Sequence, residues 1–282
     1  MSRVKTWTLM PLLASAVLLT RCSCDFFGTT GSLLIPEQKE VELGRSFDST
    51  LVHGADGKKE FPLFDAKGDP ARVAFENYVK NLAREVLAAV PERERPGYDF
   101  KFSIIDKDVE NAFAVPGGFV YIYTGIIKKM RDESELAGVL GHEIAHVTKH
   151  HYRDAVAKQA GMGILLDALL GDKAGALAQA VAGTFFQLAS LQVSQANEQE
   201  SDERGTVYTA RAGRNPLGIA KYFARAEASG VPEWLSSHPA STNRVKDVSD
   251  QVDASASYKA LVVDSATTNY KARFDAATAV IR

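Results

Sequence analysis

The segment GHEIAHVTKHH, residues 141–151, decides how this chain folds. His142 and His146 are four residues apart, so on a helix their side chains lie on one face, one turn apart. Upstream, Asp132 is followed three residues later by Glu135, which is the pattern of a helix N-terminus with a capping box. The sequence therefore predicts a helix from Asp132 to about His151 that carries two imidazoles on one face.

Two imidazoles at this spacing can bind one metal ion, and Glu143 lies between them in the sequence. HExxH is the arrangement of zinc metallopeptidases, in which the histidines bind the metal and the glutamate is the general base. We therefore predict that His142 and His146 are zinc ligands and that Glu143 is catalytic. The alternative is that the two histidines are surface residues spaced so by coincidence.

A catalytic zinc site uses three protein ligands and keeps one position open for water. The only two cysteines lie within the first 24 residues, so the third ligand is His, Asp or Glu. Segment 197–205, NEQESDERG, offers Glu198, Glu200, Asp202 and Glu203. On a helix Glu198 and Asp202 share a face, while Glu200 points about 200° away from Glu198. A ligand with a hydrogen-bonded partner would suit the first pair, although composition alone does not choose among the four acids.

Composition excludes several classes of protein. The chain has 282 residues, of which 45% are hydrophobic and 24% charged, as in soluble globular proteins. This excludes a disordered, collagen-like or polytopic membrane protein. With 33 basic against 35 acidic side chains, it lacks the positive surplus of nucleic-acid-binding proteins, and we expect no nucleic acid partner.

Residues 1–21 are predicted to be a signal peptide. Arg3 and Lys5 precede an apolar run from Leu9 to Thr20, which is too short to span a membrane. A buried first helix is the alternative. Leu19-Thr20-Arg21-Cys22 resembles a bacterial lipobox, with Arg21 where a small residue is usual.

The resemblance to a lipobox makes Cys22 the predicted lipidation site and implies a lipid anchor in a membrane. Because residue 23 is Ser, the usual bacterial sorting rule implies the outer membrane. Acylation at Cys24 would instead place Asp25 next to it, which signals retention at the inner membrane. A soluble secreted protein is the alternative to both.

The rest of the pattern predicts a mainly helical α+β fold with a small sheet before the HExxH helix. Helices are expected at 36–45, from Pro70 to before Pro91, at 196–212 and at 216–228, strands at 100–105 and 119–123, and a loop at 48–59. The apolar segment 156–193 is read as a helical hairpin, either part of the core or in contact with a membrane or substrate. The predicted divisions are 1–21 (signal peptide), 22–68 (linker and N-terminal extension), 69–250 (metallopeptidase domain) and 251–282 (C-terminal extension).

The chain resembles the M48 family of zinc metallopeptidases, in particular its bacterial periplasmic lipoproteins and its mitochondrial inner-membrane member. The matching pieces, in order, are EQKEVELGR (37–45), NAFAVPGGFVYIYTGII (111–127), HEIAH (142–146), NEQESDERG (197–205) and HPASTNR (238–244). The resemblance implies a gluzincin-type domain that binds one Zn²⁺ per chain. It also implies Glu198 as the third ligand and Asp202 as its partner, with Ser201 where the family usually has Ala.

The resemblance gives a role to the segment before the second predicted strand. It implies a loop and edge strand beside the active-site cleft, where free backbone N–H and C=O groups pair with an extended substrate. The alternative is a core hairpin that turns at the Pro-Gly-Gly sequence, and both can hold at once. The predicted substrate-binding residues are Asn111, Ala112, Phe113, Ala114, Pro116, Gly117 and Gly118.

The segment HPASTNR contains a histidine, His238, that is followed by proline. Taken alone, such a loop histidine is structural or exposed, but the resemblance implies an active-site residue. It would donate a hydrogen bond to the oxyanion of the tetrahedral intermediate, or occupy the fourth zinc position and keep the enzyme inactive. Arg244 would orient this loop or Asp202 through a bidentate pair. His150 and His151 are not expected to be ligands.

These features predict a zinc-dependent endopeptidase of the bacterial cell envelope that faces the periplasm. The resemblance implies misfolded or misassembled envelope proteins as substrates. One alternative is a chaperone-like assembly factor of the outer membrane whose zinc site is plugged by His238. Another is a structural zinc domain with a closed, four-ligand site. The sequence does not determine the oligomeric state.

Overall fold

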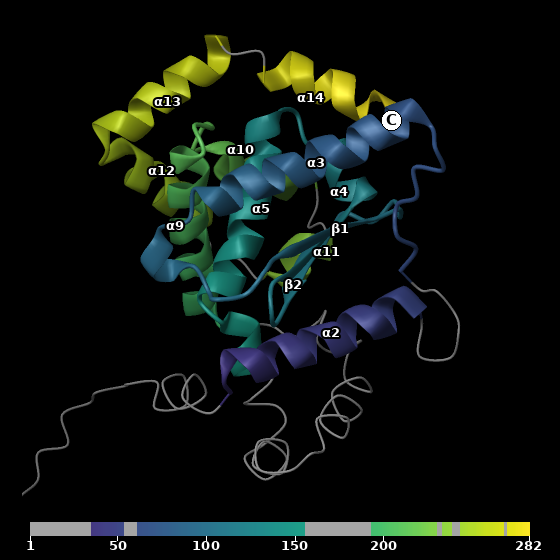
Figure 1. Ribbon diagram of the computed structural model, residues 1–282. Helices are drawn as coiled ribbons and strands as arrows, with labels where there is room; N and C mark the ends of the chain where they lie inside the picture. The colour runs from purple at the N-terminus through teal and green to yellow at the C-terminus, as the bar shows by residue number, and fades with distance from the viewer. Residues whose placement is uncertain (1–34, 54–60, 156–192, 230–232, 239–242, 268–269) are drawn as a thin grey trace, which may run out of the picture.

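The computed structural model describes residues 35–53, 61–155, 193–229, 233–238, 243–267 and 270–282 (Figure 1). The predicted signal peptide, Cys22 and residues 156–192 of the predicted hairpin lie outside these residues. The helices are α2 (Glu37–His53), α3 (Pro70–Ala88), α4 (Thr124–Lys129), α5 (Glu133–Thr148), α9 (Gln195–Arg211), α10 (Gly218–Ser229), α11 (Glu233–Ser237), α12 (Arg244–Asp253), α13 (Ala256–Thr267) and α14 (Tyr270–Thr278), with 3₁₀ turns η1 (Glu92–Glu94) and η2 (Ala279–Ile281). The strands are β1 (Lys101–Ile105), β2 (Ala112–Val115) and β3 (Phe119–Tyr123).

The three strands form one sheet in the order β1-β3-β2. Strand β1 runs parallel to β3, and β2 runs antiparallel to β3, so β2 forms an edge of the sheet. The turn between β2 and β3 contains Gly117 and Gly118, whose φ angles of 80° and 90° favour glycine. Within the described residues, no strand pairs with the outer side of β2.

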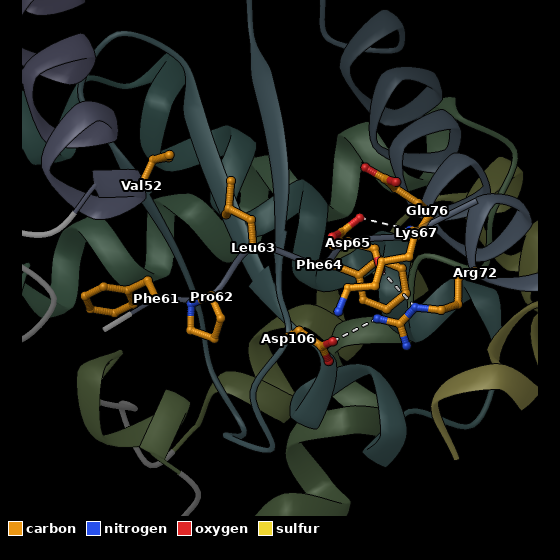
Figure 2. A pocket seen from close by; sticks show the side chains of 11 residues that line it. Val52, Phe61, Pro62, Leu63, Phe64, Asp65, Lys67, Arg72, Glu76 and Asp106 are labelled. Atoms are coloured by element: carbon orange, nitrogen blue, oxygen red, sulfur yellow. Dashed lines mark hydrogen bonds and ion pairs between the residues drawn. The ribbon is translucent and has the colours of Figure 1, made fainter. Parts of the chain in front are cut away.

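The segment at residues 61–67 covers the outer edge of β1. Phe64 N–H donates to Ile104 O at 2.8 Å, and Leu63 forms a bridge with Ile105. This segment lines a cavity of about 680 Å³ together with the end of α2 and the start of α3 (Figure 2). Arg72 projects into this cavity and contacts Asp106 at 2.9 Å.

Helix α2 covers one face of the sheet (Figure 1). Leu43, Phe47 and Leu51, spaced four residues apart, are buried against the side chains of β2 and β3. The prediction of a loop from residue 48 was therefore wrong for residues 48–53, because this apolar spacing continues the helix to His53. A Cβ at Gly44 would lie 2.0 Å from Pro116 O, so α2 approaches the β2–β3 turn as closely as glycine permits.

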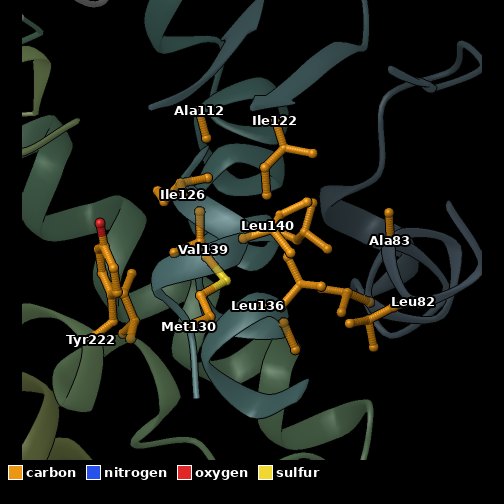
Figure 3. Packing of buried hydrophobic residues seen from close by; sticks show 14 of the residues in the cluster. Leu82, Ala83, Ala112, Ile122, Ile126, Met130, Leu136, Val139, Leu140 and Tyr222 are labelled. Carbon is orange, nitrogen blue, oxygen red and sulfur yellow. The ribbon is translucent and has the colours of Figure 1, made fainter. Parts of the chain in front are cut away.

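Helices α3 and α5 cover the other face and form the main core (Figure 3). Leu82 and Ala83 of α3 meet Leu136 and Leu140 of α5. Ile122 of β3 reaches the same cluster from the sheet. Every residue of α5 is buried, so this helix is the centre of the domain. The predicted class, a mainly helical α+β fold with a small sheet beside the HExxH helix, is confirmed.

Helix α5 begins as predicted and ends earlier. The Asp132 carboxylate accepts hydrogen bonds from the Ser134 and Glu135 N–H groups, which caps the N-terminus. The helix ends at Thr148 and not at His151, because His150 adopts a left-handed conformation with φ 57° that turns the chain.

Two glycines set the distance between α5 and α9. A Cβ at Gly205 would lie 2.7 Å from His142 N, and one at Gly141 would lie 2.9 Å from Gly205 O. Any larger side chain would therefore push the helices apart. This close packing places the acidic residues of α9 beside the HExxH motif of α5.

The C-terminal residues return to the main domain. Helix α14 packs against α3 and α5, and its Phe274 is fully buried in the main core. Among the described helices, none combines the length and the apolar character required to cross a membrane.

Candidate metal centre

Four side chains from three helical segments converge at the face where α5 meets α9. His142 and His146 come from α5, Glu198 from α9, and His238 from the residue after α11. One donor atom of each lies within 4.8 Å of the donor atoms of the other three. All four side chains are buried, and this is the one such cluster among the described residues. We call these four residues the donor cluster.

The distances within the donor cluster are short. The Nε2 atoms of His142 and His146 are 2.9 Å apart. The Glu198 carboxylate lies 3.3 Å from His142 Nε2 and 3.4 Å from His146 Nε2. Two imidazole nitrogens and a carboxylate are the donor set of a catalytic zinc site, so these residues fit the predicted metal.

Glu143, between the two histidines in sequence, belongs to the same buried region. Its Oε1 accepts a hydrogen bond from the Trp234 indole N–H at 3.1 Å and lies 3.4 Å from His238 Nε2. Its Oε2 is buried and has no hydrogen-bond partner among the residues that the structure describes. A buried carboxylate oxygen is costly to leave unpaired, and such an atom beside a metal donor set is suited to accept a proton from water.

Burial and charge shift the pKa values of the donor cluster in opposite directions. Burial lowers the pKa of His146 well below its usual value, which keeps this imidazole neutral. Burial also disfavours protonation of His142, but hydrogen bonds with Asp202 and Glu198 outweigh it and raise its pKa to about 9. Burial would raise the pKa of Glu198, yet the imidazoles of His238, His146 and His142 hold it well below its usual range. The carboxylate is therefore ionised and available to a cation.

Asp202 and Arg244 form hydrogen bonds with members of the donor cluster and with each other. His142 Nδ1 lies 2.9 Å from Asp202 Oδ1, so the ring can donate its Nδ1 proton there and direct Nε2 at the cluster. Arg244 binds Asp202 through two hydrogen bonds and also donates to His238 O at 3.0 Å. The sequence offered the loop and Asp202 as alternative partners of Arg244, and the structure places both within its reach.

The structure places His238 inside the cluster. Only 1% of the residue is exposed, and its Nδ1 lies 3.1 Å from Glu198 Oε1 and 3.2 Å from His142 Nε2. Its backbone N–H donates to Trp234 O at 2.9 Å. The interpretation of His238 as an exposed loop residue is therefore wrong.

Sequence reasoning missed Trp234. Its ring is fully buried, stacks on Phe223 at 5.4 Å between centroids and lies 5.4 Å from the His142 ring. Its position four residues before His238 was the one available signal, and no motif or periodicity marked it.

The predicted substrate segment and the competing acid Glu200 both lie outside the donor cluster. The predicted substrate segment forms β2 and the turn after it, and Ala114 shares a small apolar cluster with Val147 at the end of α5. All four residues of β2 are buried.

Glu200, the acid that competed with Glu198 as the third ligand, has a side chain that is 44% exposed. It lies outside the donor cluster. The cavity of Figure 2 is lined by none of the cluster residues.

Comparison with known proteins agrees with this geometry. The beta-barrel assembly-enhancing protease of Escherichia coli (strain K12) is 29% identical over 252 residues, which cover 82% of this chain and 50% of that protein. Metalloprotease LoiP of the same strain is 31% identical over 154 residues, covering 52% of this chain and 60% of LoiP. The human mitochondrial metalloendopeptidase OMA1 is 29% identical over 189 residues, covering 58% of this chain and 35% of OMA1.

This chain thus spans about half the length of the assembly-enhancing protease that it matches. The profile of peptidase family M48 matches residues 76–252, which include the donor cluster, Glu143, Asp202 and Arg244. The chain therefore belongs to peptidase family M48.

Proposed function

We propose that this protein is a zinc-dependent endopeptidase of the bacterial cell envelope. The observation that carries the proposal is Glu143 Oε2, which has no hydrogen-bond partner among the described residues and lies beside a buried set of two imidazoles and a carboxylate. His142, His146 and Glu198 would hold one Zn²⁺ per chain. When bound, zinc supplies a Lewis acid that polarises the scissile carbonyl and makes a nearby water molecule more acidic.

The protein's own residues would do the rest of the chemistry. Glu143 would accept the proton of the attacking water at Oε2 and later deliver it to the leaving amine. Trp234 would hold the other oxygen, Oε1, and so direct Oε2 at the water. The substrate backbone would pair with the outer edge of β2, which no strand covers within the described residues.

His238 has two possible roles in this mechanism. As a hydrogen-bond donor it would stabilise the oxyanion of the tetrahedral intermediate. As a fourth protein ligand it would occupy the position that water needs. Its Nδ1, 3.1 Å from Glu198 and 3.2 Å from His142, lies among the donor atoms, which favours the second role in the conformation observed.

That position supports a second candidate function, a chaperone-like assembly factor of the outer membrane with a plugged and mostly inactive zinc site. Several relatives carry the name beta-barrel assembly-enhancing protease, which combines assembly and proteolysis for those proteins. For this chain we propose unfolded or misassembled envelope proteins as partners in either case.

The decisive test is cleavage of an unfolded test protein by zinc-loaded wild type and two variants. We expect wild type to cleave and Glu143→Gln to be slower by 10²- to 10⁴-fold with its zinc retained, because glutamine cannot take up a proton. Faster cleavage by His238→Ala supports a plugging histidine, whereas slower cleavage supports an oxyanion donor. If Glu143→Gln cleaves within a few-fold of wild type, the peptidase mechanism is wrong.

The location in the envelope remains a separate proposal. We propose export by the signal at residues 1–21 and acylation of Cys22, which would anchor the protein to the outer membrane and leave the domain in the periplasm. Mass spectrometry of the mature N-terminus tests this. A diacylated or triacylated cysteine at position 22 supports the anchor, and acylation at Cys24 moves the predicted destination to the inner membrane. An unmodified terminus rejects both.

A further inference from the structure

His151 contacts the proposed zinc ligand His146 on the side of its ring that faces away from the donor cluster. Its Nδ1 is 3.1 Å from His146 Nδ1, on the side of that ring opposite the donor cluster. Only 4% of His151 is exposed, and the centroids of the two imidazole rings are 5.1 Å apart. His146 therefore has an imidazole neighbour where His142 has the Asp202 carboxylate.

The chain of contacts continues to an acidic side chain on α9. His151 Nε2 lies 3.3 Å from Glu200 Oε2, and Ser201 Oγ lies 3.2 Å from His151 Nδ1. The Glu200 carboxylate is therefore placed to accept the proton on His151 Nε2.

The end of α5 explains how His151 reaches this position. A continuous helix would carry residue 151 away from residue 146, because five residues rotate a side chain by about 500°. Instead, the left-handed His150 turns the chain back after Thr148. Glu40 of α2 holds this turn through His150 Nδ1 at 2.9 Å.

The hydrogen-bond directions follow from the metal. A cation bound at His146 Nε2 needs the lone pair of that atom, so the ring proton of His146 must sit on Nδ1. That N–H can donate only to an unprotonated Nδ1 of His151, which then carries its own proton on Nε2. The N–H at Nε2 of His151 in turn donates to the Glu200 carboxylate. One arrangement of protons satisfies all three groups.

The geometry points to His151 and Glu200 as positioning residues that orient His146 and fix its proton on Nδ1 for zinc binding. The inference rests on the proposed zinc site, and it gives Glu200 a role other than the ligand role that the sequence left open. Hydrogen-bond partners of this kind commonly contribute 10- to 100-fold to metal affinity.

Zinc affinity of the full chain, measured by competition with a chromophoric chelator, tests the inference without any assay of activity. We expect His151→Phe, which removes the acceptor and keeps a buried ring, to bind zinc 10- to 100-fold more weakly. His151→Asn should recover most of that loss, since its Oδ1 can accept the His146 Nδ1 proton. The visible absorption of the Co²⁺-loaded protein should change in the same order.

Two variants on α9, one test and one control, keep the experiment decisive if His151→Phe does not fold. Glu200→Ala alters a side chain that is 44% exposed and should weaken zinc binding by less than 10-fold but measurably. Glu203→Ala, which removes an exposed acid on the same helix, should bind zinc as wild type does.

Equal affinity of Glu200→Ala and Glu203→Ala would overturn the inference, and so would folded His151→Phe with wild-type affinity. His151→Asn as weak as folded His151→Phe would show that packing, and not the acceptor, matters. A wild-type protein that binds no zinc would instead reject the proposed function itself, so the two failures are distinguishable.

Discussion

The guanidinium of Arg244 binds the carboxylate of Asp202 in a bidentate pair, with Nε 2.5 Å from Oδ2 and Nη2 2.6 Å from Oδ1. Both side chains are buried, so the pair is shielded from water and salt. Asp202 in turn accepts from the His142 ring, and Arg244 holds the backbone of His238. One ion pair thus connects a proposed zinc ligand with the loop that contains His238.

Replacing Arg244 by methionine should destabilise the protein strongly. The change removes one partner of a buried ion pair and leaves the buried Asp202 carboxylate without its guanidinium, which typically costs about 3–5 kcal/mol. Urea unfolding of the zinc-free protein measures the loss. The double variant Arg244→Met with Asp202→Leu removes both charges and should recover part of it. If the double variant loses the sum of both single effects, the two residues act independently.

Removal of a proposed zinc ligand should empty the site. Wild type is expected to hold about one zinc per chain, and Glu198→Ala or His146→Ala should lose most of it because each deletes one of three protein ligands. Metal content after dialysis against a weak chelator provides the measurement. Glu203→Ala is the matched control on α9 and should retain its zinc. Retention of zinc by Glu198→Ala alongside loss in Glu200→Ala would reverse the ligand assignment.

Trp234→Phe should separate the orientation of Glu143 from metal binding. The variant keeps an aromatic ring among its buried neighbours and deletes the N–H that lies 3.1 Å from Glu143 Oε1. A hydrogen bond to a charged group is worth about 1.5–3 kcal/mol, so kcat should fall about 10- to 100-fold, with KM and zinc content little changed.

Tyr222→Phe is the matched control for Trp234. It removes a hydroxyl from the same aromatic group, and that hydroxyl donates to Glu110 and not to Glu143. We expect its kcat to stay close to that of wild type. Equal losses in the two variants would assign the effect to packing of the aromatic group.

Glu200 should contribute to stability only above its folded-state pKa. Its pKa is lowered to about 2 in the folded protein, first through the hydrogen bond from His151, against about 4.3 in an unfolded chain. The stabilisation is fully present above the unfolded value and disappears as the pH falls from about 4.3 to about 2. Acid unfolding of zinc-free Glu200→Gln, followed by circular dichroism, should therefore be less steep in this window. An acid limb identical to that of wild type would contradict the assignment, and Glu203→Gln serves as the control.

The sequence by itself determined the elements whose signals are local. The HExxH spacing, the cap at Asp132 and the aromatic, β-branched run of β3 each lie within a few residues, and they correctly predicted β3 and the start of α5. The face shared by Glu198 and Asp202 on one helix is likewise a matter of helical period, and both side chains point into the same buried region.

Tertiary structure alone decided which distant groups complete the site. His238 reaches His142 across 96 residues, Trp234 reaches Glu143 across 91, and His151 reaches Glu200 across 49. No periodicity encodes such pairs, because they depend on how closely α5 and α9 pack and on where the chain turns. The glycines at 141 and 205 and the left-handed His150 set these two quantities, since a glycine permits contact that any Cβ would block and a reversed turn redirects the side chain after it.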